Sequence, residues 1–356
     1  MKRPAPLLFA AIAASLGVVP PARAQSVPPA APALHWYRGN THAHTLESDG
    51  DSPPADVARW YRDQGYQFVF ITDHEKLTDV APLNAALAER GKFLVVAGQE
   101  VTQILADPTH PDGRRQAHVN SLLPARVVMP QGGGSVAESY RRNLAAIRAA
   151  GGLPQVNHPN WRWSVRPADM LALPDSTLFE LWNGHPTINN LGGAGGGGAT
   201  SSLSTEALWD TLLTRGTLLW AVGSDDSHTF TKPWDPKVAR PGQAWVVVRA
   251  ESLSAPALVA ALRRGDFYAS TGVTLADYRA DAAGIALTIA PFGGPRDDTR
   301  FTTEFVGRGG RVLAVVHGRE ARYRFAGGEG YVRARVVDSQ GHRAWTQPVA
   351  ERTAGR

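Results

Sequence analysis

Two patterns of apolar and polar residues alternate along most of this 356-residue chain. Short continuous apolar runs are typical of strands buried on both faces, and apolar residues at helical spacing are typical of amphipathic helices. Alternation of the two favours an α/β fold, with parallel strands in one sheet and helices outside it. Strands are predicted at 66–71, 92–97, 153–157, 177–182 and 217–222, and helices at 55–64, 80–90, 135–150 and 205–214.

The pattern of apolar and polar residues changes after about residue 271. Strands are predicted there at 275–290, 302–306, 312–317, 323–325 and 331–337, separated by Gly, Asp and Arg turns. Such a series is typical of a small all-β module built like a sandwich. We therefore expect an α/β domain at 34–274 and a C-terminal β module at 275–350. No Pro/Ser-rich linker separates them, so the module should pack on the first domain.

The first 24 residues have the features of a secretory signal peptide. Lys2 and Arg3 form a charged start, and residues 7–19 are apolar but too few to span a bilayer comfortably. Ala22-Arg23-Ala24 fits the small-residue rule for cleavage after Ala24. We expect an exported protein, periplasmic or secreted. No other apolar run is long enough to cross a membrane, so we expect no membrane insertion.

Composition narrows the possible chemistry. Apolar residues make up 43% of the chain, which allows a large core. Removal of Lys2, Arg3 and Arg23 with the signal peptide lowers the formal charge from +5 to +2, too weak a balance to indicate a nucleic acid polymer or an anionic membrane as partner. The chain has no cysteine, which excludes disulfides, thiolate zinc sites and cysteine nucleophiles. Any metal ligand must be His, Asp or Glu.

Histidines and carboxylates follow the apolar runs one after another. His42 and His44 lie two residues apart, so in an extended strand both imidazoles face the same way and can bind one cation. Imidazole and carboxylate are ligands of zinc, manganese and iron, and strand ends meet at one mouth of a barrel. The candidate metal ligands in chain order are His42, His44, Asp49, His74, Glu100, His118, His158, Asp226 and His228.

The sequence alone does not decide the roles of several residues near these motifs. Asp225 and Asp226 both precede His228, and Asp73 could either orient a ligand or cap its loop. Three arginines near these motifs are candidates for binding phosphate oxygens, although each could equally be a solvated surface residue. These arginines are Arg114, Arg115 and Arg162. Trp161, Trp163 and His185 are candidates for the pocket wall.

The glycine-rich stretch at 191–202 is not followed by Gly-Lys-Ser/Thr, so it is a poor phosphate-binding P-loop. We expect a mobile surface loop or lid there.

Taken together, the motifs resemble the PHP (polymerase and histidinol phosphatase) superfamily of metallohydrolases. Residues 178–186, 208–210, 264–272 and 344–348 are similar to its CehA/McbA-like branch, which includes a carbaryl hydrolase. The resemblance covers about residues 35–350 and implies a distorted, seven-stranded, TIM-like β/α barrel of the PHP type.

The resemblance also implies two to three divalent metal ions (Zn, Mn or Fe). One ion would be held by His42, His44, Glu100 and the C-terminal aspartate, a second by Glu100, His118 and His158, and a third by Asp49, His74 and His228. The Asp-x-His spacing of the family favours Asp226 over Asp225 as that aspartate.

The implied activity is hydrolysis of a small-molecule ester by a hydroxide that bridges two metals. Glu100, as the bridging carboxylate, Asp226 and His185 are the candidate catalytic residues, with His185 in substrate contact or proton transfer. A phosphoric ester is the leading substrate class, either a monoester or a nucleotide-like compound. The alternative is a carboxylic or carbamic ester, and the second alternative is a non-enzymatic binding protein. Two or more arginines at the site would favour phosphate, and an aromatic and aliphatic pocket would favour the carbamate.

Overall fold

The computed structural model describes residues 1, 33–193, 203–233, 235–293 and 297–351. Leu34–Arg356 forms a compact unit of its own. The expected signal peptide and most of the glycine-rich stretch lie outside the described residues. Among the described helices, none is long and apolar enough to cross a membrane.

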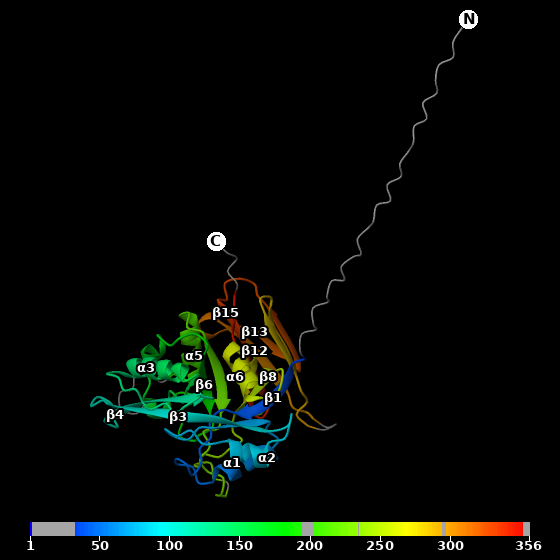
Figure 1. The fold of residues 1–356 in the computed structure, drawn as a ribbon. Helices are drawn as coiled ribbons and strands as arrows, with labels where there is room; N and C mark the ends of the chain where they lie inside the picture. Colours follow the sequence, from blue (N-terminus) through cyan, green and yellow to red (C-terminus); the bar gives the residue numbers. More distant parts are fainter. Residues whose placement is uncertain (2–32, 194–202, 234, 294–296, 352–356) are drawn as a thin grey trace. The chain divides into compact units, whose positions relative to one another are not determined.

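Helices separate the strands up to β9, except between β3 and β4 and between β7 and β8, and the chain then continues mainly in strands (Figure 1). The strands are β1 His35–Asn40, β2 Phe68–Ile71, β3 Leu94–Ala106, β4 Arg114–Leu122, β5 Leu153–Val156, β6 Thr177–Asn183, β7 Leu219–Ser224, β8 Trp245–Ala250, β9 Phe267–Ser270, β10 Leu275–Asp281, β11 Gly284–Ile289, β12 Phe301–Gly307, β13 Arg311–His317, β14 Glu320–Arg324, β15 Tyr331–Asp338, β16 Arg343–Thr346 and β17 Val349–Ala350. The helices are α1 Pro54–Asp63, α2 Ala81–Leu87, α3 Val136–Ala149, α4 Pro167–Met170, α5 Thr205–Thr214 and α6 Ala255–Arg264, with short 3-10 turns at Trp161–Trp163 and Arg308–Gly310.

A 14-stranded sheet carries β1 to β7 side by side in chain order. β1, β2 and β3 are parallel, as are β5, β6 and β7, but β4 is antiparallel to both of its neighbours. The prediction of parallel strands was therefore wrong at β4, which forms a long hairpin with β3 (Figure 1). The apolar pattern missed this strand because Gln116, His118 and Asn120 are polar yet buried in it.

The segments that follow β1 and β7 meet at the end of the strand series. Ala43 and Ser227 form a parallel bridge, the His44 amide donates to the Ser227 carbonyl at 2.9 Å, and the Asp226 amide donates to the His42 carbonyl at 3.0 Å. No ladder joins β7 to β1 within the described strands, where β8 pairs antiparallel with β1 instead. The structure thus shows seven strands side by side in chain order and joins the segments after the first and the last of them, without showing a closed barrel.

β2 is buried on both faces, as its unbroken apolar sequence predicts. Phe68 and Phe70 point into a cluster that also contains Leu258 and Leu262 of α6. The alternate residues of β2 point to the other side and pack with α1, for example at Tyr61. Side chains alternate between the faces of a strand, so one apolar run supplies both clusters.

The C-terminal strands divide between two sheets. β10, β11 and β14 form a three-stranded sheet, while β12, β13, β15 and β16 continue the large sheet through the pairing of β16 with β9. Side chains from both sheets share one apolar cluster, which includes Tyr278, Leu287, Phe305 and Val336. This arrangement is sandwich-like, and the boundary at 274/275 stays a prediction.

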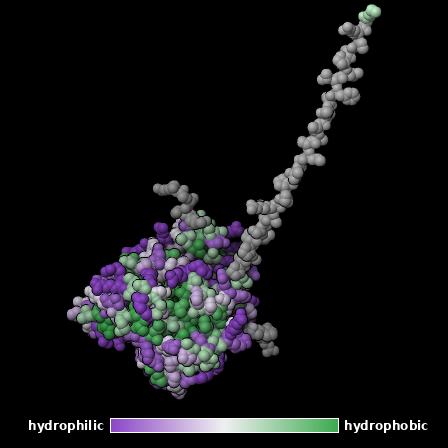
Figure 2. All heavy atoms as spheres, viewed as in Figure 1, coloured by the Kyte–Doolittle hydropathy of each residue, from purple (hydrophilic) through white to green (hydrophobic). Residues whose placement is uncertain are grey.

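The surface drawn in Figure 2 is polar around most of its edge, with apolar residues nearer its middle. Large apolar side chains exposed to solvent include Leu46, Ile104, Met129, Phe292 and Val315. They belong to separate segments of the chain, and single exposed apolar residues are normal in a folded protein.

A buried ion pair ties α5 to β15. Arg333 is 1% exposed, and its Nε and Nη2 donate to the two carboxylate oxygens of Asp210 at 2.8 and 2.7 Å. Its Nη1 lies 2.8 Å from Glu206, also on α5, and the Tyr331 hydroxyl donates to Asp210 at 2.7 Å. The pair therefore fastens the C-terminal strands to the α/β region.

We predict that Arg333→Ala lowers the free energy of unfolding by about 3–5 kcal/mol, because it leaves the buried Asp210 without its counter-charge, while Glu206 keeps Arg335. Chemical denaturation measures this loss. The exposed Arg322 is the matched control, and Arg322→Ala should stay within about 0.5 kcal/mol of wild type. Equal stability of the two variants would show that the ion pair does not fasten these elements.

Candidate metal centre

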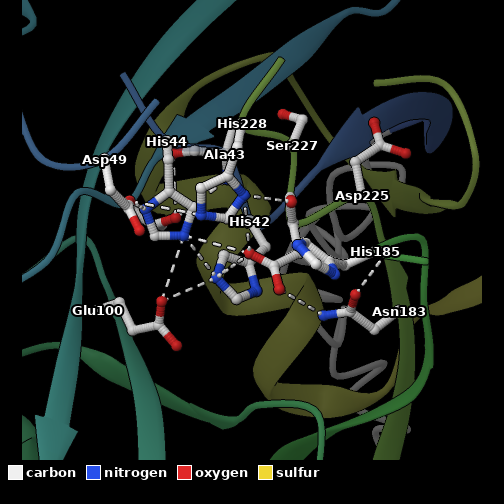
Figure 3. Close-up of polar contacts among 12 residues, drawn as sticks. His42, Ala43, His44, Asp49, Glu100, Asn183, His185, Asp225, Ser227 and His228 are labelled. Carbon is white, nitrogen blue, oxygen red and sulfur yellow. Dashed lines mark hydrogen bonds and ion pairs between the residues drawn. The ribbon is translucent and has the colours of Figure 1, made fainter. Parts of the chain in front are cut away.

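The structure brings all nine candidate ligands together at one end of the strand series, where they form three groups. His42 and His44 directly follow β1, and Glu100 and His118 lie within the paired strands β3 and β4. The remaining ligands come from the segments after β1, β2, β5 and β7. Figure 3 shows His42, His44, Asp49, Glu100 and His228 directed toward one another.

The first group has the dimensions of a four-coordinate metal site. It consists of His42 Nε2, His44 Nε2, Glu100 Oε2 and Asp226 Oδ1, and five of the separations among these atoms lie between 3.1 and 3.2 Å. A tetrahedron with metal–ligand bonds of about 2.0 Å has edges of about 3.3 Å. The residues present therefore fit a divalent metal ion.

Glu100 divides its two oxygens between the first group and the second. Its Oε2 faces His42 and His44, whereas its Oε1 lies 3.0 Å from His118 Nδ1 and 3.3 Å from His158 Nε2. Glu100 is 1% exposed, so water does not solvate these oxygens. This is the arrangement that a carboxylate shared between two ions requires.

The third group surrounds Asp49, whose side chain is 54% exposed. His228 Nε2 lies 3.4 Å from one of its oxygens, and His74 Nε2 lies 3.6 Å from the other. His44 Nδ1 is 3.3 Å from Asp49, so His44 belongs to this group as well as to the first. The family resemblance gave His44 to the first group alone.

The charges in the cluster are strongly coupled. Burial by itself would raise the pKa of the Glu100 carboxyl, but neighbouring imidazoles hold it well below its usual value. Burial would likewise lower the pKa of His42, but the carboxylates around it raise that pKa well above its usual value. The Glu100 carboxylate is therefore ionised, and the His42 ring holds a proton that a divalent cation would replace.

Several imidazoles are oriented by an acceptor on the ring atom that faces away from the cluster. The Nδ1 of His42 donates to Glu180 at 2.7 Å, and that of His228 donates to the backbone carbonyl of Asp226 at 2.8 Å. His118 Nε2 lies 3.1 Å from the side-chain oxygen of Gln116. Such contacts fix the tautomer, leaving the other ring nitrogen directed at the cluster.

Glu180, in β6, is a residue to which the sequence interpretation gave no role. It is 1% exposed, and besides His42 it accepts from the His158 amide at 2.6 Å. It also accepts from Ser224, at the end of β7, and from Asn183. One carboxylate thus connects the segments after β1, β5 and β7. The polar residue within the buried run 178–182 was the signal that could have found it.

Asp225 and Asp226 face opposite ways. Figure 3 shows Asp225 turned away from the cluster, where its carboxylate accepts from Tyr61 at 2.8 Å and from the amides of Gly242, Gln243 and Ala244. Burial raises the pKa of Asp225 to about 6, although these hydrogen bonds oppose the rise. Asp226, with a backbone φ of 50°, points into the first group.

We predict that Asp226→Ala loses about one metal ion per chain after reconstitution, because it removes a ligand atom from the first group. Asp225→Ala should keep its metal and lose stability instead, since three backbone amides lose their acceptor. Elemental analysis of the two purified variants makes the comparison. A larger loss of metal from Asp225→Ala would reverse the assignment.

Asp73 caps its loop. Its carboxylate accepts from the Thr45 amide at 2.8 Å, from the Ser48 hydroxyl at 2.8 Å and from the Thr78 hydroxyl at 2.8 Å. These contacts hold the segment between His44 and Asp49 in place. Of the two open roles for Asp73, the structure favours the cap.

The three candidate arginines are not brought to the cluster. Arg115 is buried, pairs with Asp169 and donates to the Ser164 carbonyl at 2.6 Å. Arg162 is exposed, pairs with Asp112 at 3.1 Å and lies over the ring of Trp161. Arg114 is exposed at the start of β4. The sequence placed these residues near ligand motifs, but the long β3–β4 hairpin carries 114 and 115 away from them.

A cavity of about 340 Å³ opens onto the cluster. Members of all three ligand groups line it, together with His185, Thr229 and Lys237. Its apolar wall consists of Trp161, Ile188, Val238 and Ala239. No arginine lines it within the part of the chain that the structure describes.

A hydrogen bond to the His185 ring shows which of its nitrogens carries the proton. The Thr187 amide donates to His185 Nδ1 at 3.2 Å, so the neutral ring carries its proton on Nε2. Burial lowers the pKa of His185, which keeps the ring neutral near pH 7. His185 is therefore a hydrogen-bond donor at the cavity wall.

No protein-family model matches the chain, and no curated protein matches it. A solved two-domain protein from Bacteroides vulgatus, containing a predicted PHP-like metal-dependent phosphoesterase, is similar at 15% identity and a TM-score of 0.47, covering 85% of this chain and 90% of that one. A proposed metal-dependent phosphoesterase from Bifidobacterium adolescentis is similar at 14% identity and a TM-score of 0.36, covering 55% of this chain and 90% of that one. At this degree of similarity, support for a function comes from the site geometry.

Proposed function

We propose that this protein is a metal-dependent hydrolase that holds two or three divalent ions. The observation that carries the proposal is the near-tetrahedral set of His42, His44, Glu100 and Asp226 atoms, with Glu100 shared with a second group. Divalent ions bound there would lower the pKa of a water molecule and polarise a phosphoryl or carbonyl oxygen. The signal-like N-terminal sequence supports an exported enzyme.

A small phosphoric ester is the substrate class that the charges support best. The ligand groups contain three carboxylates, and two or three divalent ions carry more positive charge than these carboxylates carry negative charge. The loaded site would therefore attract an anion without any arginine. Lys237 adds a cationic side chain to the cavity wall.

The residues of the chain have distinct roles in this proposal. Glu100 and Asp226 hold ions, and Glu180 fixes the His42 ring through Nδ1. His185 donates from Nε2 to an oxygen of the substrate and so stabilises charge that develops there. In the reaction, the oxygen of water bonds to phosphorus. The bond to the ester oxygen breaks, and that oxygen leaves with the electron pair and takes up a proton.

A carboxylic or carbamic ester is the alternative, and the cavity wall favours it in one respect. Trp161, Ile188, Val238 and Ala239 form an apolar surface, and no arginine joins them in the described residues. The cavity is nevertheless mixed, because His185, Thr229 and Lys237 also line it.

A panel of chromogenic esters tests the proposal. The protein is stripped with a chelator, reconstituted separately with Mn, Zn and Fe, and assayed on 4-nitrophenyl phosphate, bis(4-nitrophenyl) phosphate, 4-nitrophenyl acetate and 1-naphthyl N-methylcarbamate. We expect metal-dependent turnover that is fastest on a phosphoric ester and about a thousandfold lower in Glu100→Gln. Turnover of the carbamate or acetate alone would establish the alternative, and no metal-dependent turnover would overturn the proposal.

A further inference from the structure

Trp161 is the aromatic side chain on the apolar wall of the cavity. It is half-buried, and its ring centroid lies 5.1 Å from that of His118 and 5.5 Å from that of His158. The indole therefore stands beside two ligands of the second group and still faces open space. Any substrate whose reacting atom reaches these ligands brings its organic part close to this ring.

The loop that carries Trp161 is held in an unusual backbone conformation. Arg162 and Trp163 have φ values of 50° and 57°, in the left-handed region that non-glycine residues rarely adopt. The tip of the β3–β4 hairpin supports the loop, since His110 contacts the Arg162 carbonyl at 2.9 Å and Asp112 pairs with Arg162. Strain that is maintained by such contacts is characteristic of functional sites.

Trp161 contacts a guanidinium and also lines the apolar part of the cavity wall. The Arg162 guanidinium lies over the ring at 5.4 Å from its centroid, and this residue is itself fixed by Asp112. The cavity that Trp161 lines also has Ile188, Val238 and Ala239 on its wall, and these side chains have no polar atoms. A flat apolar group bound against this part of the wall would take no hydrogen-bond partner away from these side chains.

We propose that Trp161 binds the leaving group of the substrate, and that this leaving group carries an aromatic ring. The inference rests on the proposed function, because it places the phosphoryl group at the ligand cluster. The substrate class is then an aryl phosphate, which hydrolyses to a phenol and inorganic phosphate. The cavity of about 340 Å³ is at the small end of ligand pockets, which span about 300–1,000 Å³, and it suits a single small ester.

The test compares two non-hydrolysable anions, phenylphosphonate and methylphosphonate, which differ in the ring. Calorimetry gives the affinity of each for the metal-loaded wild type and for Trp161→Ala, Trp161→Phe and Trp163→Ala. Trp163 is the matched control, because it lies in the same strained loop and does not line the cavity. We expect wild type to prefer phenylphosphonate by about tenfold, and Trp161→Ala to lose most of that preference. Trp161→Phe and Trp163→Ala should keep it.

The ratio of the two affinities separates the possible outcomes. A loss of metal from Trp161→Ala would weaken both anions and leave the ratio unchanged, which would count against the inference. Equal affinity of wild type for both anions would also overturn it, while the proposed function would stand. Failure of wild type to bind either anion would instead contradict the proposed phosphoric ester activity.

Discussion

Glu100→Gln should reduce kcat/KM by about a thousandfold, the largest effect that we expect from a single substitution. The two oxygens of Glu100 face different ligand groups, at 3.1–3.2 Å from His42 and His44 and at 3.0 Å from His118. An amide has no negative charge, and its NH2 group would face one of these groups as a donor. The variant therefore perturbs two ion sites at once.

Steady-state kinetics on the best ester of the panel, with metal content measured on the same samples, checks this result. His185→Ala is the comparison, because His185 lines the cavity but belongs to none of the three ligand groups. It should lose about a hundredfold, the usual cost of one donor to a developing charge. Near-wild-type activity of Glu100→Gln with unchanged metal content would show that Glu100 is not shared between ions.

Glu180→Gln should weaken metal binding by about 10–100-fold, although Glu180 belongs to none of the three ligand groups. Both oxygens of Glu180 accept hydrogen bonds, one from His42 Nδ1 at 2.7 Å and the other from the His158 amide at 2.6 Å. A glutamine replaces one acceptor by a donor, so either the His42 ring or the His158 backbone must turn away. The first ligand group then loses its arrangement.

Competition with a chromogenic chelator measures the affinity of this variant for zinc. Glu304→Gln is the matched control, since Glu304 is a half-buried glutamate that pairs with Arg335 in the C-terminal strands. The control should keep wild-type affinity. Equal zinc affinity in Glu180→Gln and Glu304→Gln would show that Glu180 has only a structural role.

Most of the strands that the apolar pattern predicted are present. Residues 66–71 and 177–182 are mostly apolar because both faces of β2 and β6 are buried. Such runs are recognisable as strands in the sequence. β4 was missed for the opposite reason. It carries the buried His118 and Asn120, whose partners are Glu100 in β3 and Asn157 just after β5. A buried polar strand is recognisable only when those partners are known.

Most of the candidate ligands could be predicted because they stand at or near the end of a strand, where the sequence changes from apolar to polar, although Glu100 and His118 lie within β3 and β4. The arginines could not be placed in the same way. Arg115 is close in sequence to His118, but its guanidinium pairs with Asp169, a contact that depends on where α4 packs. Likewise, Glu180 acquires its role from three segments that converge in space.

The number of metal ions per chain tests the central claim most directly. The protein is stripped with a chelator, reconstituted with an excess of Zn, Mn or Fe, freed of unbound ions and analysed for metal and protein content. Nine ligand residues in three groups exceed what one cation coordinates, so we predict at least two divalent ions per chain for one of these metals. One ion or none per chain, with every metal tested, would contradict the account.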